Sequence, residues 1–169
     1  MSKTTRVINA SAERIFAVLA DGWTYSDWVV GTAHIRDVDA DWPAPGSHIH
    51  HKAGPWPVSL RDSTVSMECQ PGRMLLLKVR LWPMGAGVAR FVVDPLGPDA
   101  ARVTLYEQFT EGPLIGLRNK VNDVLLHYRN REALRRLADL ATRRPATAPV
   151  ASTPDHAAAA SMETDTAQR

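Results

Sequence analysis

The feature that most constrains the fold is a long succession of short strands followed by one long helix. Between residues 33 and 110 the chain is interrupted repeatedly by clusters rich in proline and glycine. Connections this short favour an antiparallel meander, in which each strand pairs with the next. The turn signals delimit six expected strands, at 33–39, 47–53, 58–69, 73–81, 88–94 and 101–110.

Shorter elements precede the meander, and the long helix follows it. An alternating stretch at residues 4–9 predicts a first strand, and Ser11 is placed to cap a helix over residues 12–20. A second short helix or turn is expected in the aromatic stretch that ends with Trp28. Residues 114–141 have the apolar periodicity of a helix.

The apolar side of the long helix changes direction partway along. Its first half carries one stripe, whereas the leucines after residue 131 lie on a different side. Such a change requires a kink or a new packing partner, and the sequence leaves both possibilities open. The residues of the first stripe are Leu117, Val121, Val124, Leu125 and Tyr128.

A curved antiparallel sheet with one apolar face needs a covering element, and the terminal helix is long enough to supply it. We therefore expect an α+β protein with a curved seven-stranded antiparallel sheet wrapped around a long C-terminal helix. Two short helices are expected between strands 1 and 2. A sheet bent in this way does not close perfectly against one helix, and the gap is a natural ligand cavity.

Length and composition indicate one folded domain and a tail. The chain has 169 residues, enough for one domain with a sizeable core. We expect this domain at residues 1–144. Residues 145–169 are rich in alanine, proline and threonine and have few side chains able to form a core. They are predicted to be a disordered tail.

Several classes of protein are disfavoured by the same composition. The sequence contains no apolar run of about 18 residues, so no stable membrane insertion is expected. Its N-terminus lacks the apolar segment of a secretory signal, and Cys69 is the single cysteine, so we expect a cytoplasmic protein without a disulfide. A formal net charge of +2 does not indicate a nucleic-acid partner.

The last expected strand places a carboxylate among apolar side chains. Val103, Leu105 and Phe109 share one face with Glu107, and this face is predicted to point inward. A buried carboxylate is a candidate general acid or base, or an anchor for a polar group of a ligand. The alternative is that Glu107 lies at the cavity mouth, solvated or paired with an arginine.

Three histidines lie in the stretch HIHHK at residues 48–52. His51 shares its parity with Ile49 and is predicted to face inward, whereas His48 and His50 face outward. A metal site is not expected, because these histidines point to opposite faces and no third ligand is near. His51 is a candidate catalytic group or donor to a ligand, the alternative being an ordinary hydrogen-bonded histidine.

In the strand at 58–69 the apolar residues change parity. Val65, Met67 and Cys69 alternate in a phase opposite to that of the residues before them, and we expect them to face inward. A bulge near residues 62–64 would account for the change of phase.

Aromatic and aliphatic side chains complete the expected cavity wall. The tryptophans lie in or beside connections, and each could instead complete the core. The predicted ligand-binding set is Trp28, Trp56, Leu77, Val79, Trp82, Phe91, Leu105, Val121 and Tyr128.

The chain is similar to members of the START-related SRPBCC superfamily, of the polyketide cyclase/dehydrase and lipid transport type. The similarity covers about residues 3–144 and rests on element order and on VINASAERIFAVLADGWTYSDW, CQPGRMLLL and RNREALRRLADLA. This resemblance implies a helix-grip fold with a hydrophobic cavity. It implies no particular reaction, because the superfamily includes enzymes, carriers and sensors.

The sequence supports three hypotheses about function. The first is binding or transport of a hydrophobic small molecule, lipid or polyketide-like, without a cofactor. The second is a polyketide cyclase or aromatase in which Glu107 and His51 move protons. The third is an interaction module that uses the arginines of the last helix, although interspersed acidic residues favour a solvated surface there. Monomer and homodimer both remain open.

Overall fold

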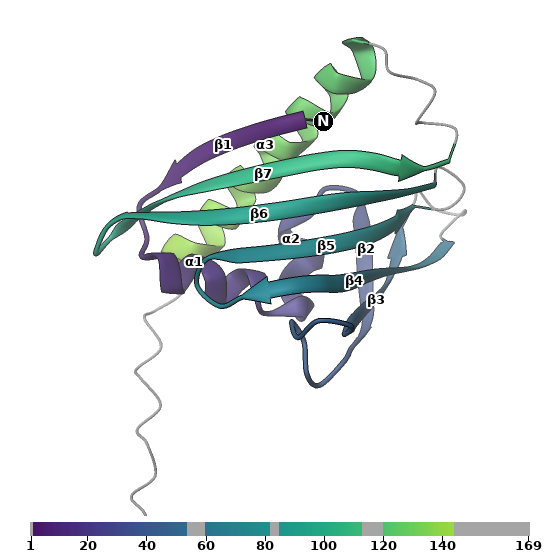
Figure 1. Ribbon diagram of the computed structural model, residues 1–169, viewed down its shortest axis with the longest axis horizontal. Helices are drawn as coiled ribbons and strands as arrows, with labels where there is room; N and C mark the ends of the chain where they lie inside the picture. The colour runs from purple at the N-terminus through teal and green to yellow at the C-terminus, as the bar shows by residue number, and fades with distance from the viewer. Residues whose placement is uncertain (1, 54–59, 82–84, 113–119, 144–169) are drawn as a thin grey trace, which may run out of the picture.

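The computed structural model describes residues 2–53, 60–81, 85–112 and 120–143, which form one curved antiparallel sheet and the helices packed on it (Figure 1). The strand order is β1-β7-β6-β5-β4-β3-β2, so the first strand closes the meander by pairing with the last. The seven strands are β1 (Ser2–Ile8), β2 (Thr32–Val38), β3 (His48–Ala53), β4 (Leu60–Gln70), β5 (Met74–Leu81), β6 (Gly85–Gly97) and β7 (Ala100–Glu111).

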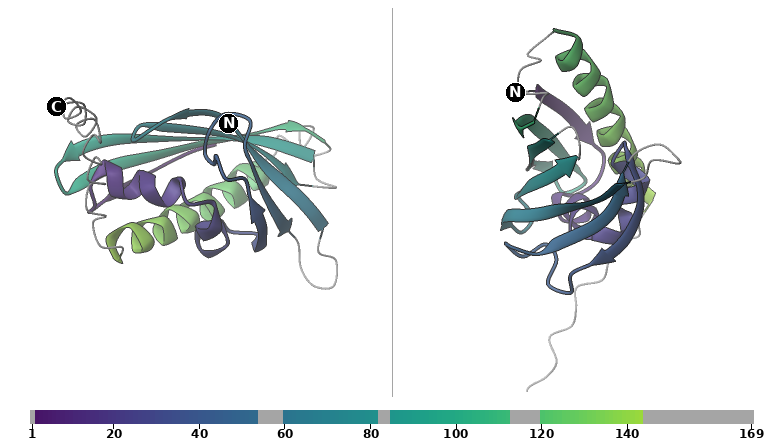
Figure 2. Two further views of the ribbon diagram at one scale, coloured as in Figure 1. Left: turned by 90° about the horizontal axis from the view of Figure 1, so that it is seen from below. Right: turned by 90° about the vertical axis from the view of Figure 1, so that its right-hand side faces the viewer.

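The helices lie against one face of the sheet, and the sheet bends around the longest of them (Figure 2). Between β1 and β2 lie α1 (Ala12–Leu19), a 3₁₀ turn η1 (Gly22–Thr24) and α2 (Tyr25–Trp28). The long helix α3 (Lys120–Arg143) follows β7. This arrangement confirms the predicted helix-grip architecture. No helix of the described part is both long and apolar enough to cross a lipid bilayer.

The predicted cap of helix α1 is present. Ser11 Oγ accepts a hydrogen bond from the backbone N–H of Arg14 at 3.3 Å. We expect Ser11→Ala to lower the free energy of unfolding by about 1 kcal/mol, because that N–H loses its partner. Ser11→Asp retains an acceptor and should lose much less. Urea unfolding of both variants checks this, and equal stability of Ser11→Ala and the wild type would contradict the capping role.

The core fills the space between the sheet and the two longer helices at one end of the molecule. From α1, Ile15 and Leu19 are fully buried, and from α3, Leu134 and Leu137 are buried against them. Burial of such side chains stabilises the fold by about 1.5–3 kcal/mol each.

The side chains of β4 that face inward differ from the prediction. Val65 is half-buried and Met67 is exposed, although the sequence pattern assigned both to the core. Polar partners inside the molecule explain the difference, because Ser66 Oγ donates a hydrogen bond to the Pro43 carbonyl at 2.8 Å. Among residues 62–70 of this strand, the buried side chains are Asp62, Thr64 and Ser66.

The bulge of β4 lies further along the strand than predicted. The register against β5 shifts between Ser66 and Glu68, not at residues 62–64. Met67 is therefore the additional residue, and the alternation reverses after it. As a result Cys69 packs against the core, as predicted, while Met67 points away.

The prediction that Tyr128 lies on the inward side of the long helix is wrong. Its side chain is 65% exposed. Inward positions on either side of it belong to Leu126 and Asn130, which are both buried. The apolar pattern missed this stripe because Asn130, a polar residue, occupies an inward position. The part of the predicted helix at residues 114–119 lies outside the described residues.

Candidate functional site

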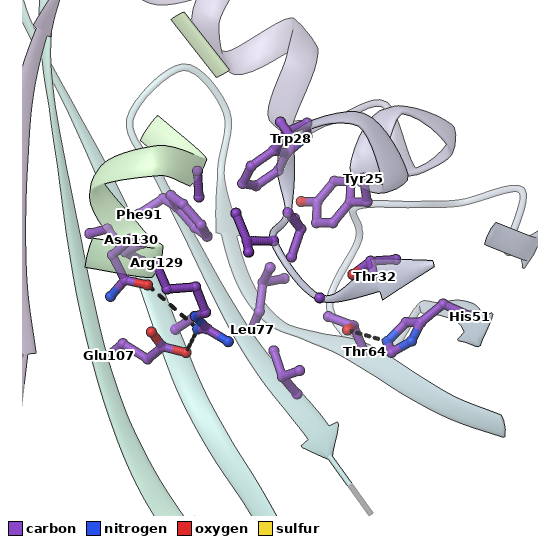
Figure 3. A pocket seen from close by; sticks show the side chains of 17 residues that line it. Tyr25, Trp28, Thr32, His51, Thr64, Leu77, Phe91, Glu107, Arg129 and Asn130 are labelled. Carbon is purple, nitrogen blue, oxygen red and sulfur yellow. Dashed lines mark hydrogen bonds and ion pairs between the residues drawn. The ribbon is translucent and has the colours of Figure 1, made fainter. Parts of the chain in front are cut away.

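A cavity of about 110 Å³ lies between the inner face of the sheet, helix α2 and helix α3 (Figure 3). Helix α3 contributes Arg129, Asn130 and Ala133 to its wall, just before the leucines that fill the core. Most of the lining is apolar. The apolar lining residues are Tyr25, Trp28, Val29, Val30, Leu77, Val79, Ala89, Phe91, Leu105 and Ala133.

A small side chain in the middle of the sheet helps to make this space. Leu77, Ala89 and Glu107 lie opposite one another on β5, β6 and β7 and form one cross-strand row. Side chains on such a row point to the same face of the sheet. Because Ala89 reaches only one methyl group into the interior, the space between Leu77 and Glu107 is left open.

An ion pair marks one end of the cavity. Arg129 Nη2 donates a hydrogen bond to Glu107 Oε1, and the same nitrogen lies 3.5 Å from Asn130 Oδ1. Glu107 is 8% exposed, and the Arg129 side chain is 30% exposed. The predicted inward carboxylate is therefore buried and paired with an arginine. Because the two charges cancel, this end of the cavity carries no net charge.

Two buried polar atoms at this end have no hydrogen-bond partner among the described residues. They are Glu107 Oε2, an acceptor, and Asn130 Nδ2, a donor. A buried polar atom without a partner costs about 1–3 kcal/mol. Both residues line the cavity, but these two atoms are themselves inaccessible to water, so a molecule in the cavity can supply the missing partners only when the side chains turn toward it.

His51 lies at the opposite end, facing the cavity as the alternation indicates. It is buried, and its Nε2 is 3.1 Å from Thr64 Oγ1. Burial lowers the pKa of His51, the Asp62 carboxylate partly opposes this effect, and His50 adds to it. The imidazole is therefore neutral near pH 7. His48 and His50 point outward, where both lie within 4 Å of Asp39.

We expect the buried imidazole of His51 to make the fold less stable in acid. Its folded-state pKa is below the unfolded value of 6.5, so the unfolded chain takes up a proton that the folded chain excludes. The contribution of the neutral His51 imidazole to the free energy of unfolding is complete above about pH 7. It is lost as the pH falls through about 6.5. His51→Gln should flatten this part of the profile in urea unfolding, whereas the exposed His34→Gln should not. Identical profiles for His51→Gln and the wild type would contradict the prediction.

Glu107 and His51 are not close enough to act on one atom. They lie on β7 and β3, which are four strand spacings of about 4.8 Å apart along the sheet. Figure 3 places them at opposite ends of the cavity, with Leu77 between them, and each is bound to a different partner. The cavity therefore has two separate polar ends and an apolar middle.

The predicted site residues are placed as follows. Trp56 and Trp82 lie outside the described residues, as does the side chain of Val121, and Tyr128 points away from the cavity. The predicted residues that line the cavity are Trp28, His51, Leu77, Val79, Phe91, Leu105 and Glu107.

Sequence reasoning missed four polar residues of the wall, which are Thr32, Thr64, Arg129 and Asn130. Thr64 lies where the sequence predicted a bulge, so its face was not assigned. For the last two, the available signal was the break in the apolar stripe at residues 129–131. Among the described residues, no group of three or more His, Cys, Asp or Glu side chains is arranged to hold a metal ion.

A comparison with family models shows to which protein family the chain belongs. The model described as polyketide cyclase/dehydrase and lipid transport matches residues 2–142. The chain belongs to this family. Membership in the polyketide cyclase/dehydrase and lipid transport family confirms the resemblance seen in the sequence, and the match covers every residue of the cavity wall.

Solved structures of similar fold include both enzymes and START proteins. The Zhui aromatase/cyclase from Streptomyces sp. R1128 has 14% identity and a TM-score of 0.65, over 84% of this chain and 93% of that one. A START superfamily protein from Mycobacterium smegmatis has 18% identity and a TM-score of 0.56, over 82% and 91%. At identities this low, the likeness shows the fold alone. No curated protein matches the chain.

Proposed function

We propose that this protein binds a hydrophobic small molecule in the cavity between the sheet and α3. The observation that carries the proposal is a wall of apolar side chains from α2, β5, β6 and β7, represented by Trp28, Leu77, Phe91 and Leu105. Moving apolar ligand surface from water into such a site is favourable by roughly 25 cal/mol per Å². Family membership supports the proposal, because the family description includes lipid transport.

The size of the cavity limits what it holds. Its volume of about 110 Å³ is close to that of an engineered cavity of roughly 150 Å³ that binds benzene. Sites for drug-sized ligands measure roughly 300–1,000 Å³. The cavity therefore accepts a single ring, or the end of a longer molecule whose remainder lies outside it.

A polyketide cyclase or aromatase is the second candidate function. Glu107 and His51 both face the cavity, and a fold relative is an aromatase/cyclase. General acid–base catalysis at one carbon requires both groups within hydrogen-bond reach of the substrate, directly or through a water. Their location at opposite ends favours binding over this reaction. Cytoplasmic location and absence of a nucleic-acid partner remain predictions.

Native mass spectrometry of the protein purified from its own host tests the proposal. We expect a noncovalent adduct of a small apolar molecule, recovered chemically unchanged after incubation with the protein. A retained molecule that is converted, with conversion lost in Glu107→Gln, would support the enzyme instead. Absence of any adduct, together with no uptake of added toluene, would contradict binding.

A further inference from the structure

The Glu107 end of the cavity is equipped for one particular kind of polar group. Glu107 Oε2 and Asn130 Nδ2 are buried without partners among the described residues, and Asn130 is only 1% exposed. Arg129 Nη2 contacts both side chains, so the unused acceptor and the unused donor lie in one small region (Figure 3). Both residues also line the cavity, so rotation of the two side chains would bring a single group of the bound molecule within reach of both atoms.

The chemistry of the two atoms limits what that group is. A carboxylate oxygen only accepts hydrogen bonds, and an amide nitrogen only donates them. The partner must therefore donate to Glu107 and accept from Asn130. A hydroxyl does both through one atom. A ketone or an ether only accepts, an ammonium only donates, and either leaves one protein atom unmatched.

The charges at this end exclude an ionic ligand. Glu107 and Arg129 neutralise each other, so a further charge in the cavity has no counter-ion. A ligand carboxylate would compete with Glu107 for Arg129, and a ligand cation would compete with Arg129 for Glu107. In each case one buried charge loses its partner, which is strongly unfavourable.

We propose that the bound molecule is a neutral alcohol or phenol whose hydroxyl donates to Glu107 Oε2 and accepts from Asn130 Nδ2. The cavity volume indicates that the part of the ligand next to the hydroxyl is about the size of one ring. This inference rests on the proposed function, since it specifies the ligand of the same cavity.

Calorimetric titration with a matched set of single-ring probes tests the inference. We expect p-cresol to bind at least about tenfold more tightly than toluene or 4-methylanisole, a difference of about 1.4 kcal/mol. In 4-methylanisole the hydroxyl of p-cresol is methylated, so its oxygen accepts hydrogen bonds but cannot donate one. The anionic probe 4-methylbenzoate should bind weakest. A purely apolar cavity would give the reverse order, because toluene is the more hydrophobic molecule.

Two variants assign the preference to the proposed atoms. Asn130→Leu removes the donor at similar volume, and the double variant Glu107→Met with Arg129→Met removes the acceptor without leaving an unpaired charge. In each, the ratio of p-cresol affinity to toluene affinity should fall to about one. Gln108→Leu, on the exposed outer face of the same strand, should keep the wild-type ratio. Thermal unfolding shows whether each variant is folded. If Asn130→Leu is not folded, the double variant still tests the site.

The outcomes separate the two proposals. Preference for p-cresol that disappears in both variants supports the hydroxyl site. Binding of toluene as tightly as p-cresol, tighter binding of 4-methylbenzamide than of p-cresol, or a preference that survives in both variants overturns it and leaves the proposed function standing. Failure of every probe to bind overturns the proposed function.

Discussion

Arg129→Met is expected to lower the free energy of unfolding by about 3–5 kcal/mol, because it leaves the Glu107 carboxylate buried without its partner. Glu107 is 8% exposed and has its Oε1 bound to Arg129, while its Oε2 has no partner among the described residues. The variant therefore holds a charge in the interior that neither water nor a cation compensates. Urea unfolding at pH 7 measures the effect.

Two controls distinguish this cost from the loss of a favourable contact. Replacing both Glu107 and Arg129 by methionine removes the charges together, and should leave stability within about 1 kcal/mol of the wild type. Lys78→Met breaks the exposed Lys78–Glu111 pair, and should cost less than about 1 kcal/mol. Equal losses in Arg129→Met and Lys78→Met would show that Glu107 is solvated and would contradict the buried ion pair.

Ala89→Phe is expected to abolish ligand binding, with a loss of at least about a hundredfold in the affinity for toluene, or about 2.7 kcal/mol. The phenyl ring would project from the middle of the row formed by Leu77, Ala89 and Glu107. An engineered cavity of roughly 150 Å³ holds one benzene ring, so the new phenyl ring would take up the space of about 110 Å³ that the ligand ring needs. Calorimetric titration with toluene checks the loss.

The neighbouring position provides the control for this experiment. Val88 lies on the opposite face of β6 and is half-buried, so Val88→Phe should leave toluene binding unchanged. Overpacking costs about 1–3 kcal/mol, so circular dichroism and thermal unfolding must show that Ala89→Phe is folded. Undiminished toluene binding by a folded Ala89→Phe would place the binding site elsewhere.

Strand alternation was enough to predict the inward direction of two polar side chains. His51 and Glu107 both lie in strands whose period of two is regular, so their apolar neighbours Ile49 and Leu105 fixed the face. The order of elements was similarly informative. Short turn-separated strands followed by one long helix leave few compact arrangements, and the helix-grip fold is one of them.

Hydrophobic pattern alone could not predict the polar part of the wall. Asn130 is among the most buried residues of α3, yet the pattern gave its inward place to Tyr128, which is exposed. On β4, Thr64 and Ser66 face inward because they form hydrogen bonds there, with His51 and with the Pro43 carbonyl. Met67 faces outward. Such positions depend on contacts between distant segments, which a local period does not encode.

On helix α3 the pattern fails where the cavity is polar. Arg129 and Asn130 interrupt the apolar stripe of the helix, and Arg129 forms an ion pair with Glu107 of β7, which lies 22 residues earlier in the chain. A side chain that serves packing alone would be apolar at a position as buried as Asn130. This agreement between pattern failure and site location is what a binding role predicts.

The most direct test of the account is a crystal structure of the protein under xenon pressure. Xenon enters an empty apolar cavity without any specific recognition, so the result does not depend on the identity of the natural ligand. We expect one strong xenon site between Leu77, Phe91 and Leu105, absent in Ala89→Phe. Electron density showing that side chains fill this space, with no xenon bound there, would contradict the account.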